Sequence, residues 1–229
     1  MEFDCLQVTR YEQNCSILRC EATSKAAVID PGGDVYLIHD YLALMELELE
    51  VVLISHGHFD HAGGAAELAS LTRARIEGPQ RGDEHLLNGL AQVGQRHGLH
   101  SQDVTPDRWL QDGDQVRFGD VVIDVLHCPG HTKGHVAYFS KSRRQAFVGD
   151  ILFRHSIGAW QHPDGNLPHL VDSIRSKLFP LGDDVQFVPG HGETSTFGHE
   201  RQANPFVGDE AYARWRIRFG LDGAPPSHL

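Results

Sequence analysis

One stretch of the chain gathers more potential ligands than any other, and it reads Ser55-His56-Gly57-His58-Phe59-Asp60-His61-Ala62-Gly63-Gly64. It follows an apolar run at 51–54, which predicts a buried strand, and precedes an alanine-rich run at 65–69, which predicts a helix. His56 and His58 lie two residues apart, so in extended backbone both imidazoles point to one side and can bind one ion. The carboxylate and the imidazole after the bend can face a second ion. The stretch therefore predicts a metal site.

The composition is that of an ordinary globular protein, with 229 residues, 40% of them hydrophobic and 22% charged. We expect one domain over 1–218 and a flexible tail over 219–229. The net charge of −11 argues against nucleic acid as a partner. We see no secretory signal and no membrane span, and the four cysteines show no C-x-x-C pairing. We therefore expect a cytoplasmic protein with reduced thiols. The oligomeric state does not follow from the sequence.

The rest of the chain predicts strands followed by helices, twice over. In the first half we expect strands at 6–8, 15–20 and 26–30, a helix over 35–48 capped by Asp34, and mainly helix over 80–98. In the second half we expect hairpins over 116–127 and 136–148, a strand at 186–188, and helices at 168–178, 197–203 and 208–218. This order indicates two strand-rich halves with helices outside.

Three further stretches place a polar side chain directly after a predicted strand. They lead to His131, Asp150 and His191, two of them through a Pro-Gly pair. Open sheets build their sites at such strand ends. Each signal is weak when taken alone, because a histidine after Pro-Gly is most often a loop residue. Together with the 56–61 cluster, they complete two metal shells.

The combined pattern resembles the metallo-β-lactamase superfamily, and within it the short bacterial glyoxalase II-like hydrolases that lack the C-terminal helical domain. The motifs that carry the resemblance are His56-x-His58-x-Asp60-His61, Asp30-Pro31-Gly32, Cys128-Pro129-Gly130-His131-Thr132-x-Gly134-His135, Gly149-Asp150-x-Leu152-Phe153, Pro189-Gly190-His191-Gly192 and Asn204-Pro205-Phe206. The resemblance covers about residues 3 to 210. It implies an α/β fold, an αββα sandwich of two mixed β-sheets flanked by helices, with the site at one edge.

The resemblance also implies a ligand set for two divalent ions. His56, His58 and His131 would hold the first ion. Asp60, His61 and His191 would hold the second, with Asp150 bridging both and with Asp60 and Asp150 as the catalytic carboxylates. Zinc is the expected metal, and iron and manganese are alternatives. Asp30 and His135 are candidates for orienting the ligand imidazoles; alternatively, Asp30 caps its turn and His135 makes ordinary hydrogen bonds.

Two metals on one water lower the pKa of that water and supply a hydroxide. A thiolate leaves readily, so a thioester such as S-lactoylglutathione, a small molecule, is the expected substrate. A lactonase or esterase, or a mononuclear iron persulfide dioxygenase, are the alternatives on this scaffold. A β-lactamase, a nuclease and a non-catalytic metal-binding module are less favoured.

Some residues near the site leave the family pattern or are open to a second interpretation. Ala159 and Gln161 stand where the short forms carry arginine and aspartate, with Trp160 between them, so the substrate preference is open. Cys128 is either a catalytic thiol or, as we favour, a small buried residue. Lys133 either meets an anionic substrate group or is a solvated surface lysine.

Overall fold

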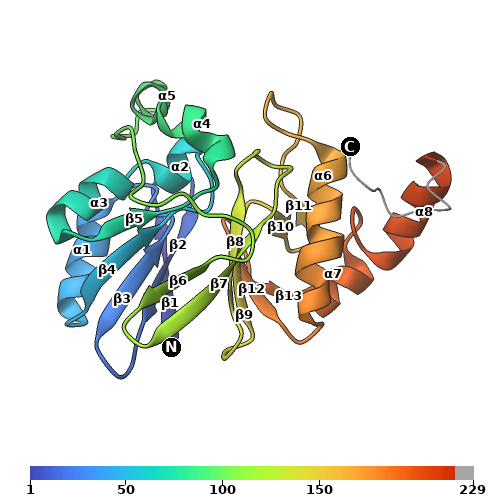
Figure 1. Cartoon of the computed structure of the whole chain (residues 1–229). Coiled ribbons are helices and arrows are strands. Elements are labelled where there is room, and N and C mark those ends of the chain that lie inside the picture. Colours follow the sequence, from blue (N-terminus) through green and yellow to red (C-terminus); the bar gives the residue numbers. More distant parts are fainter. Residues whose placement is uncertain (220–229) are drawn as a thin grey trace.

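The computed structural model describes residues 1–219 as two β-sheets packed face to face, with helices on both outer faces (Figure 1). The first half contains β1 (Glu2–Val8), β2 (Gln13–Arg19), β3 (Lys25–Ile29), α1 (Val35–Leu44), β4 (Glu48–Leu53), α2 (Phe59–Ala62), α3 (Ala65–Thr72), β5 (Arg75–Glu77), α4 (Glu84–Leu87) and α5 (Leu90–Arg96). The second half contains β6 (Gln115–Phe118), β7 (Val121–His127), β8 (Val136–Ser140), β9 (Gln145–Gly149), β10 (Leu152–Phe153), β11 (Ser156–Ile157), α6 (Leu167–Asp172), β12 (Gln186–Pro189), β13 (Ser195–Thr196), α7 (Phe197–Ala203) and α8 (Asp209–Phe219).

Both large sheets are mixed. The first has the order β1-β2-β3-β4-β5, with antiparallel pairs up to β3 and parallel pairs from β3 to β5. The second has the order β13-β12-β9-β8-β7-β6, and only its β12–β9 pair is parallel among the strands described. Parallel neighbours end at the same edge of a sheet, so the segments that follow β3 and β4, and those that follow β9 and β12, meet in pairs.

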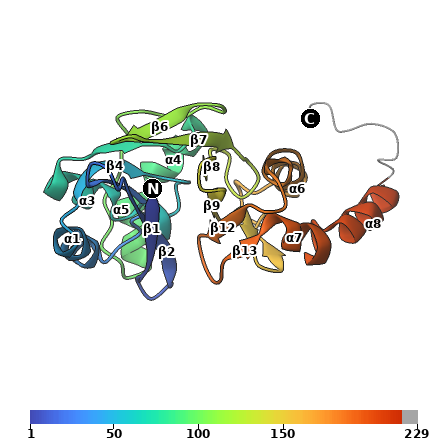
Figure 2. The ribbon, with the colours of Figure 1, turned by 90° about the horizontal axis from the view of Figure 1, so that it is seen from below.

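Three apolar layers hold the sandwich together. Successive side chains of a strand point to opposite faces. In β4, Val51 and Leu53 therefore pack between the sheets, whereas Val52 packs beneath α1 and α3. In β8, Tyr138 packs between the sheets and Phe139 packs towards α6 and α7. Figure 2 shows these helices on the two opposite outer faces. The predicted αββα sandwich is confirmed, and the continuous apolar run at 51–54 reflects a strand buried on both faces.

Several local predictions were wrong in detail. The stretch 80–98 is mainly helical as expected, but it is divided into a 3₁₀ turn, α4 and α5, and the last two are separated at Gly89, a residue with low helix propensity. The helix expected over 35–48 ends at Leu44. Asp34 precedes α1 but does not cap it, because its carboxylate accepts a hydrogen bond from the Thr9 amide at 2.6 Å. The short strands β5, β10, β11 and β13 were not predicted.

The expected tail over 219–229 lies outside the described residues, except for Phe219 at the end of α8. Among the described helices, we find none with the length and apolar character needed to cross a membrane.

Candidate metal centre

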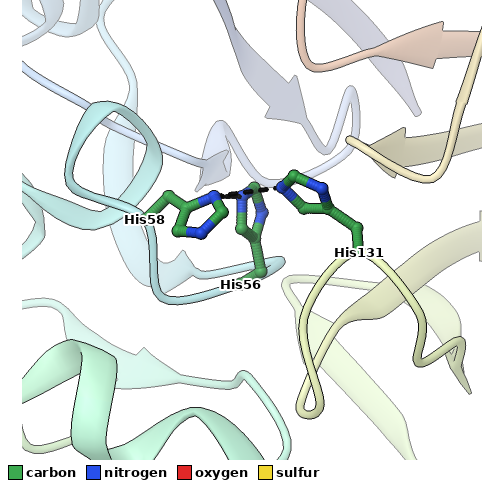
Figure 3. A group of neighbouring side chains, drawn as sticks. All are labelled: His56, His58 and His131. Atoms are coloured by element: carbon green, nitrogen blue, oxygen red, sulfur yellow. Dashed lines mark hydrogen bonds between the residues drawn. The ribbon is translucent and has the colours of Figure 1, made fainter. Parts of the chain in front are cut away.

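Three imidazole nitrogens converge at the edge of the sandwich (Figure 3). His58 Nδ1 lies 3.1 Å from His56 Nε2 and 3.0 Å from His131 Nε2. His56 and His58 follow β4, whereas His131 follows β7 in the other sheet, so the group joins the two sheets. We call these three residues the first triplet.

In His56 and His131, the hydrogen bond made by Nδ1 fixes the tautomer of the ring. The Ser55 hydroxyl has one proton, which it donates to Asp30 Oδ2 at 2.5 Å, so it accepts from His56 Nδ1 at 3.0 Å. His131 Nδ1 likewise donates to the carbonyl oxygen of Ala159 at 2.8 Å. Both Nε2 atoms therefore carry lone pairs where they face His58. His58 Nδ1 carries at most one proton, so it cannot donate a full hydrogen bond to both Nε2 atoms. These three nitrogens therefore suit a bound cation better than a hydrogen-bond network.

A second group of ligand atoms lies beside the first and consists of Asp60, His61 and His191, whose atoms are within 4.8 Å of one another. We call these residues the second triplet. His61 Nδ1 faces Asp30 Oδ2 at 3.0 Å, and His191 Nδ1 donates to the Tyr11 carbonyl at 3.0 Å. Each imidazole therefore directs its Nε2 towards the carboxylates. His191 Nε2 lies 3.3 Å from Asp60 Oδ2.

Asp150 lies between the two triplets. Its Oδ1 is 3.3 Å from His61 Nε2, and its Oδ2 is 3.7 Å from His131 Nε2 and 4.0 Å from His191 Nε2. The Asp150 amide donates to His135 Nε2 at 3.1 Å, and the His135 ring stacks on His56 at 4.5 Å. His135 thus positions Asp150, as Asp30 positions His61. The close approach also requires Gly190, because a Cβ there would lie 2.1 Å from Asp150 Oδ1.

The electrostatics of the two triplets differ. Burial lowers the pKa values of all three histidines of the first triplet, that of His58 to about 3. The first triplet therefore stays neutral. Burial also opposes charge on His61, but Asp150 and the neighbouring carboxylates raise its pKa well above the usual range. Burial by itself would raise the pKa of Asp150, but the charge on His61 lowers it, so this carboxyl stays ionised.

Two buried atoms at the centre have little hydrogen bonding. His61 Nε2 and Asp150 Oδ1 face each other at 3.3 Å as an ion pair, and neither has a further hydrogen-bond partner among the described residues. Buried polar atoms without partners are rare in native proteins. An imidazole nitrogen that has given up its proton and a carboxylate oxygen are both ligand atoms for divalent cations. The residues present therefore fit a metal ion.

Asp83 ties together the two loops that carry the first triplet, a role that no sequence pattern indicated. This buried carboxylate accepts from the amide of Gly57 at 2.9 Å, the amide of Gly134 at 2.6 Å and the hydroxyl of Thr132 at 2.7 Å. The loop that carries His56 and His58 is thereby fixed against the loop that carries His131.

We expect Asp83→Ala to destabilise the protein by about 2–4 kcal/mol, because three buried donors lose their acceptor. Urea denaturation of metal-free protein measures this, with Asp103→Ala as the control. The exposed Asp103 accepts only from the Ala91 amide among the bonds described, so its loss should change stability by about 1 kcal/mol or less. Equal urea midpoints of unfolding for the two variants would contradict this role of Asp83.

The structure brings all seven predicted site residues together, and it resolves most of the open alternatives. Cys128 is fully buried and burial raises the pKa of its thiol to about 12, so it is not a reactive nucleophile. Lys133 pairs with Asp164 at 3.0 Å and is largely exposed. One residue near the first triplet, His162, was missed.

The fold and this cluster of imidazoles and carboxylates define a metal-dependent hydrolase of the αββα type. The sequence model of the metallo-beta-lactamase superfamily matches residues 8–199, and the chain belongs to that superfamily. It is 37% identical over 213 residues to hydroxyacylglutathione hydrolase GloC of Haemophilus influenzae, covering 92% of this chain and 100% of the relative.

Solved structures agree with this classification. The BLEG-1 B3 metallo-beta-lactamase superposes with a TM-score of 0.83 at 28% identity, covering 90% of this chain and 99% of that one. ETHE1 from Myxococcus xanthus superposes with a TM-score of 0.78 at 25% identity, covering 99% and 93%. Glyoxalase II-like, lactamase and ETHE1 chains thus share this scaffold. The fold alone therefore does not identify the substrate.

Proposed function

We propose that the protein is a dinuclear metal-dependent hydrolase of thioesters, with S-lactoylglutathione or a related hydroxyacylglutathione as substrate. The observation that carries the proposal is the assembly of two complete triplets on either side of Asp150, with His61 Nε2 and Asp150 Oδ1 buried and facing each other. The likeness to GloC along nearly the whole chain supports the choice of substrate class. Zinc is our preferred metal, and iron or manganese fit the same donors.

In this proposal the first triplet would hold one ion, the second triplet would hold the other, and Asp150 would contribute a carboxylate to both. When bound, such a pair supplies a hydroxide at neutral pH and polarises the substrate carbonyl. Without metal, Asp60 and Asp150 are already ionised, because the charged imidazoles near them lower the pKa of each carboxyl against the opposing effect of burial. Their oxygens can accept a hydrogen bond from the attacking water and orient it. Asp30 and His135 hold these groups in place.

A thioester suits this site because of its leaving group. A thiol has a pKa of about 8.5, so the departing thiolate needs no protonated side chain beside it. The partner is then a small molecule, and the net charge of −11 disfavours nucleic acid. All four cysteines are free, which is typical of a reducing compartment and supports our proposal of a cytoplasmic location.

A persulfide dioxygenase is the alternative from another reaction class, and the likeness to ETHE1 fits it as well. Such an enzyme uses a single iron. Here the second triplet is fully assembled and His135 is in place beside Asp150, which favours hydrolysis. Oxygen consumption with glutathione persulfide tests this alternative.

A substrate panel on one metal-loaded preparation tests the proposed function. We expect kcat/KM for S-lactoylglutathione to exceed that for simple lactones, oxygen esters and β-lactams by at least about 10-fold, since the thiolate is the better leaving group. Protein treated with chelator is the control. Faster turnover of a lactone would replace the proposal with a lactonase, and oxygen uptake without hydrolysis would replace it with the dioxygenase.

The two ions should leave at different pH values. The proton on His61 competes with metal for Nε2 at every pH below its raised pKa, so the affinity of the second triplet rises with pH. The first triplet has lowered pKa values and stays neutral to lower pH. As the pH is lowered, we therefore expect the metal content to fall from two ions to one before the ion of the first triplet leaves. Dialysis followed by elemental analysis measures this. Loss of both ions in a single step would contradict it.

A further inference from the structure

The loop at 159–165 brings a further imidazole to the centre, and the proposed mechanism leaves it without a role. The ring of His162 lies 5.5 Å from that of His58 and 5.3 Å from that of His131, at interplanar angles of 65° and 78°. Its Nε2 is buried and has no hydrogen-bond partner within the part of the chain that the structure describes. A polar atom is therefore held next to the first triplet with its hydrogen-bonding capacity unused.

The loop has little freedom to satisfy this atom by moving. Its end is bound to the ligand loop, because the Asn166 amide donates to the Gly130 carbonyl at 2.8 Å. Asp164 pairs with Lys133 at 3.0 Å and with His85 at 3.1 Å. The Gly165 amide closes a turn on the His162 carbonyl at 2.9 Å. The backbone at and after His162 is thus tied to the loop that carries His131.

His162 is not a member of the first triplet. The ligand atoms that gather within 4.8 Å of one another belong to His56, His58 and His131. His162 contacts that group through the faces and edges of two of its rings. Its ring therefore lies beside the first triplet, and its Nε2 has no hydrogen-bond partner within the described residues.

We infer that His162 contacts the substrate, with Nε2–H donating a hydrogen bond to the carbonyl oxygen of the scissile thioester. This inference rests on the proposed function. Negative charge develops on that oxygen when water attacks the carbonyl carbon, and a preorganised donor in a dry site stabilises this charge more than the ground state. The hydrogen bond is therefore expected to raise kcat more than it lowers KM. Phenylalanine would replace His162 without loss if the ring only filled space. The substitution His162→Phe therefore distinguishes a packing role from a hydrogen-bonding role.

The test compares His162→Phe, which keeps an aromatic ring without the donor, with His162→Gln, which keeps a donor. His39→Phe, on α1, is the control. We expect kcat/KM of His162→Phe to fall by about 10²-fold, mostly in kcat, with metal content unchanged by elemental analysis. His162→Gln should regain at least a tenth of wild-type kcat, and His39→Phe should match wild type. Wild-type kinetics in His162→Phe, or a loss explained by missing metal, would overturn the inference.

A binding readout separates this inference from the proposed function. Acetohydroxamate presents a carbonyl oxygen to a metal without being hydrolysed, and calorimetry measures its affinity. We expect His162→Phe to bind it about 10-fold more weakly than wild type at equal metal content. If wild type hydrolyses no thioester but this difference persists, the proposed function fails and the inference stands. Equal affinities, or no hydroxamate binding by metal-loaded wild type, overturn the inference itself.

Discussion

Replacing Asp150 with alanine is expected to reduce kcat/KM by at least about 10³-fold and to leave one ion or none per chain. Asp150 lies between the triplets and directs one oxygen to His61 and the other towards His131 and His191. Removing it takes away the negative charge that lets two cations lie side by side. Stabilisation by a metal pair is worth several kcal/mol, and about 4 kcal/mol corresponds to the factor given.

Two measurements on the same preparation check this result, namely elemental analysis and the initial rate of thioester hydrolysis. Asp40→Ala serves as the matched control, because Asp40 is a highly exposed carboxylate on α1. Asp150→Asn keeps the shape of the side chain and tests whether the charge is what matters. Wild-type turnover in Asp150→Ala, or a loss equal to that of Asp40→Ala, would rule out a bridging role.

His58→Ala is expected to cause a loss of similar size, about 10³-fold in kcat/KM, but to retain one ion. Its Nδ1 is the atom that both other nitrogens of the first triplet approach, at 3.1 and 3.0 Å, so its removal leaves only two ligands there. The second triplet keeps its three residues and its link to Asp30. The retained ion should therefore follow the pH dependence expected for His61.

Measuring the metal content of His58→Ala as a function of pH checks the assignment of His58 to the first triplet. His100→Ala is the control, because His100 is an exposed histidine outside both triplets. If His58→Ala holds two ions, His58 is not a ligand. If it holds none, the two triplets do not bind independently, and the separate roles proposed for them fail.

The convergence of the candidate ligands was predictable because several of them follow strands directly and because the motifs resemble those of a known superfamily. His56 and His58 are fixed by their spacing after a strand, and Asp150 and His191 each follow a strand of apolar residues. The parallel pairing of β9 with β12 then brings the last two to one edge. The αββα layers follow from the same apolar runs and from the resemblance that the motifs carry.

Other features depend on contacts distant in sequence, which no local pattern reports. Asp83 binds the amide of Gly134, 51 residues further along the chain. His162 reaches the first triplet only because its loop is tied to Gly130 and Lys133. The failure of Asp34 as a cap has the same origin, because the Thr9 amide, 25 residues earlier, takes its carboxylate.

The central claim is that the seven side chains hold two cations, and the most direct measurement is anomalous diffraction from crystals of the metal-loaded protein. We predict two anomalous peaks about 3.5–4 Å apart, one within the triplet His56, His58 and His131 and the other within Asp60, His61 and His191, with Asp150 touching both. A map with no peak among these residues, or with its strongest peak elsewhere on the molecule, would contradict the account.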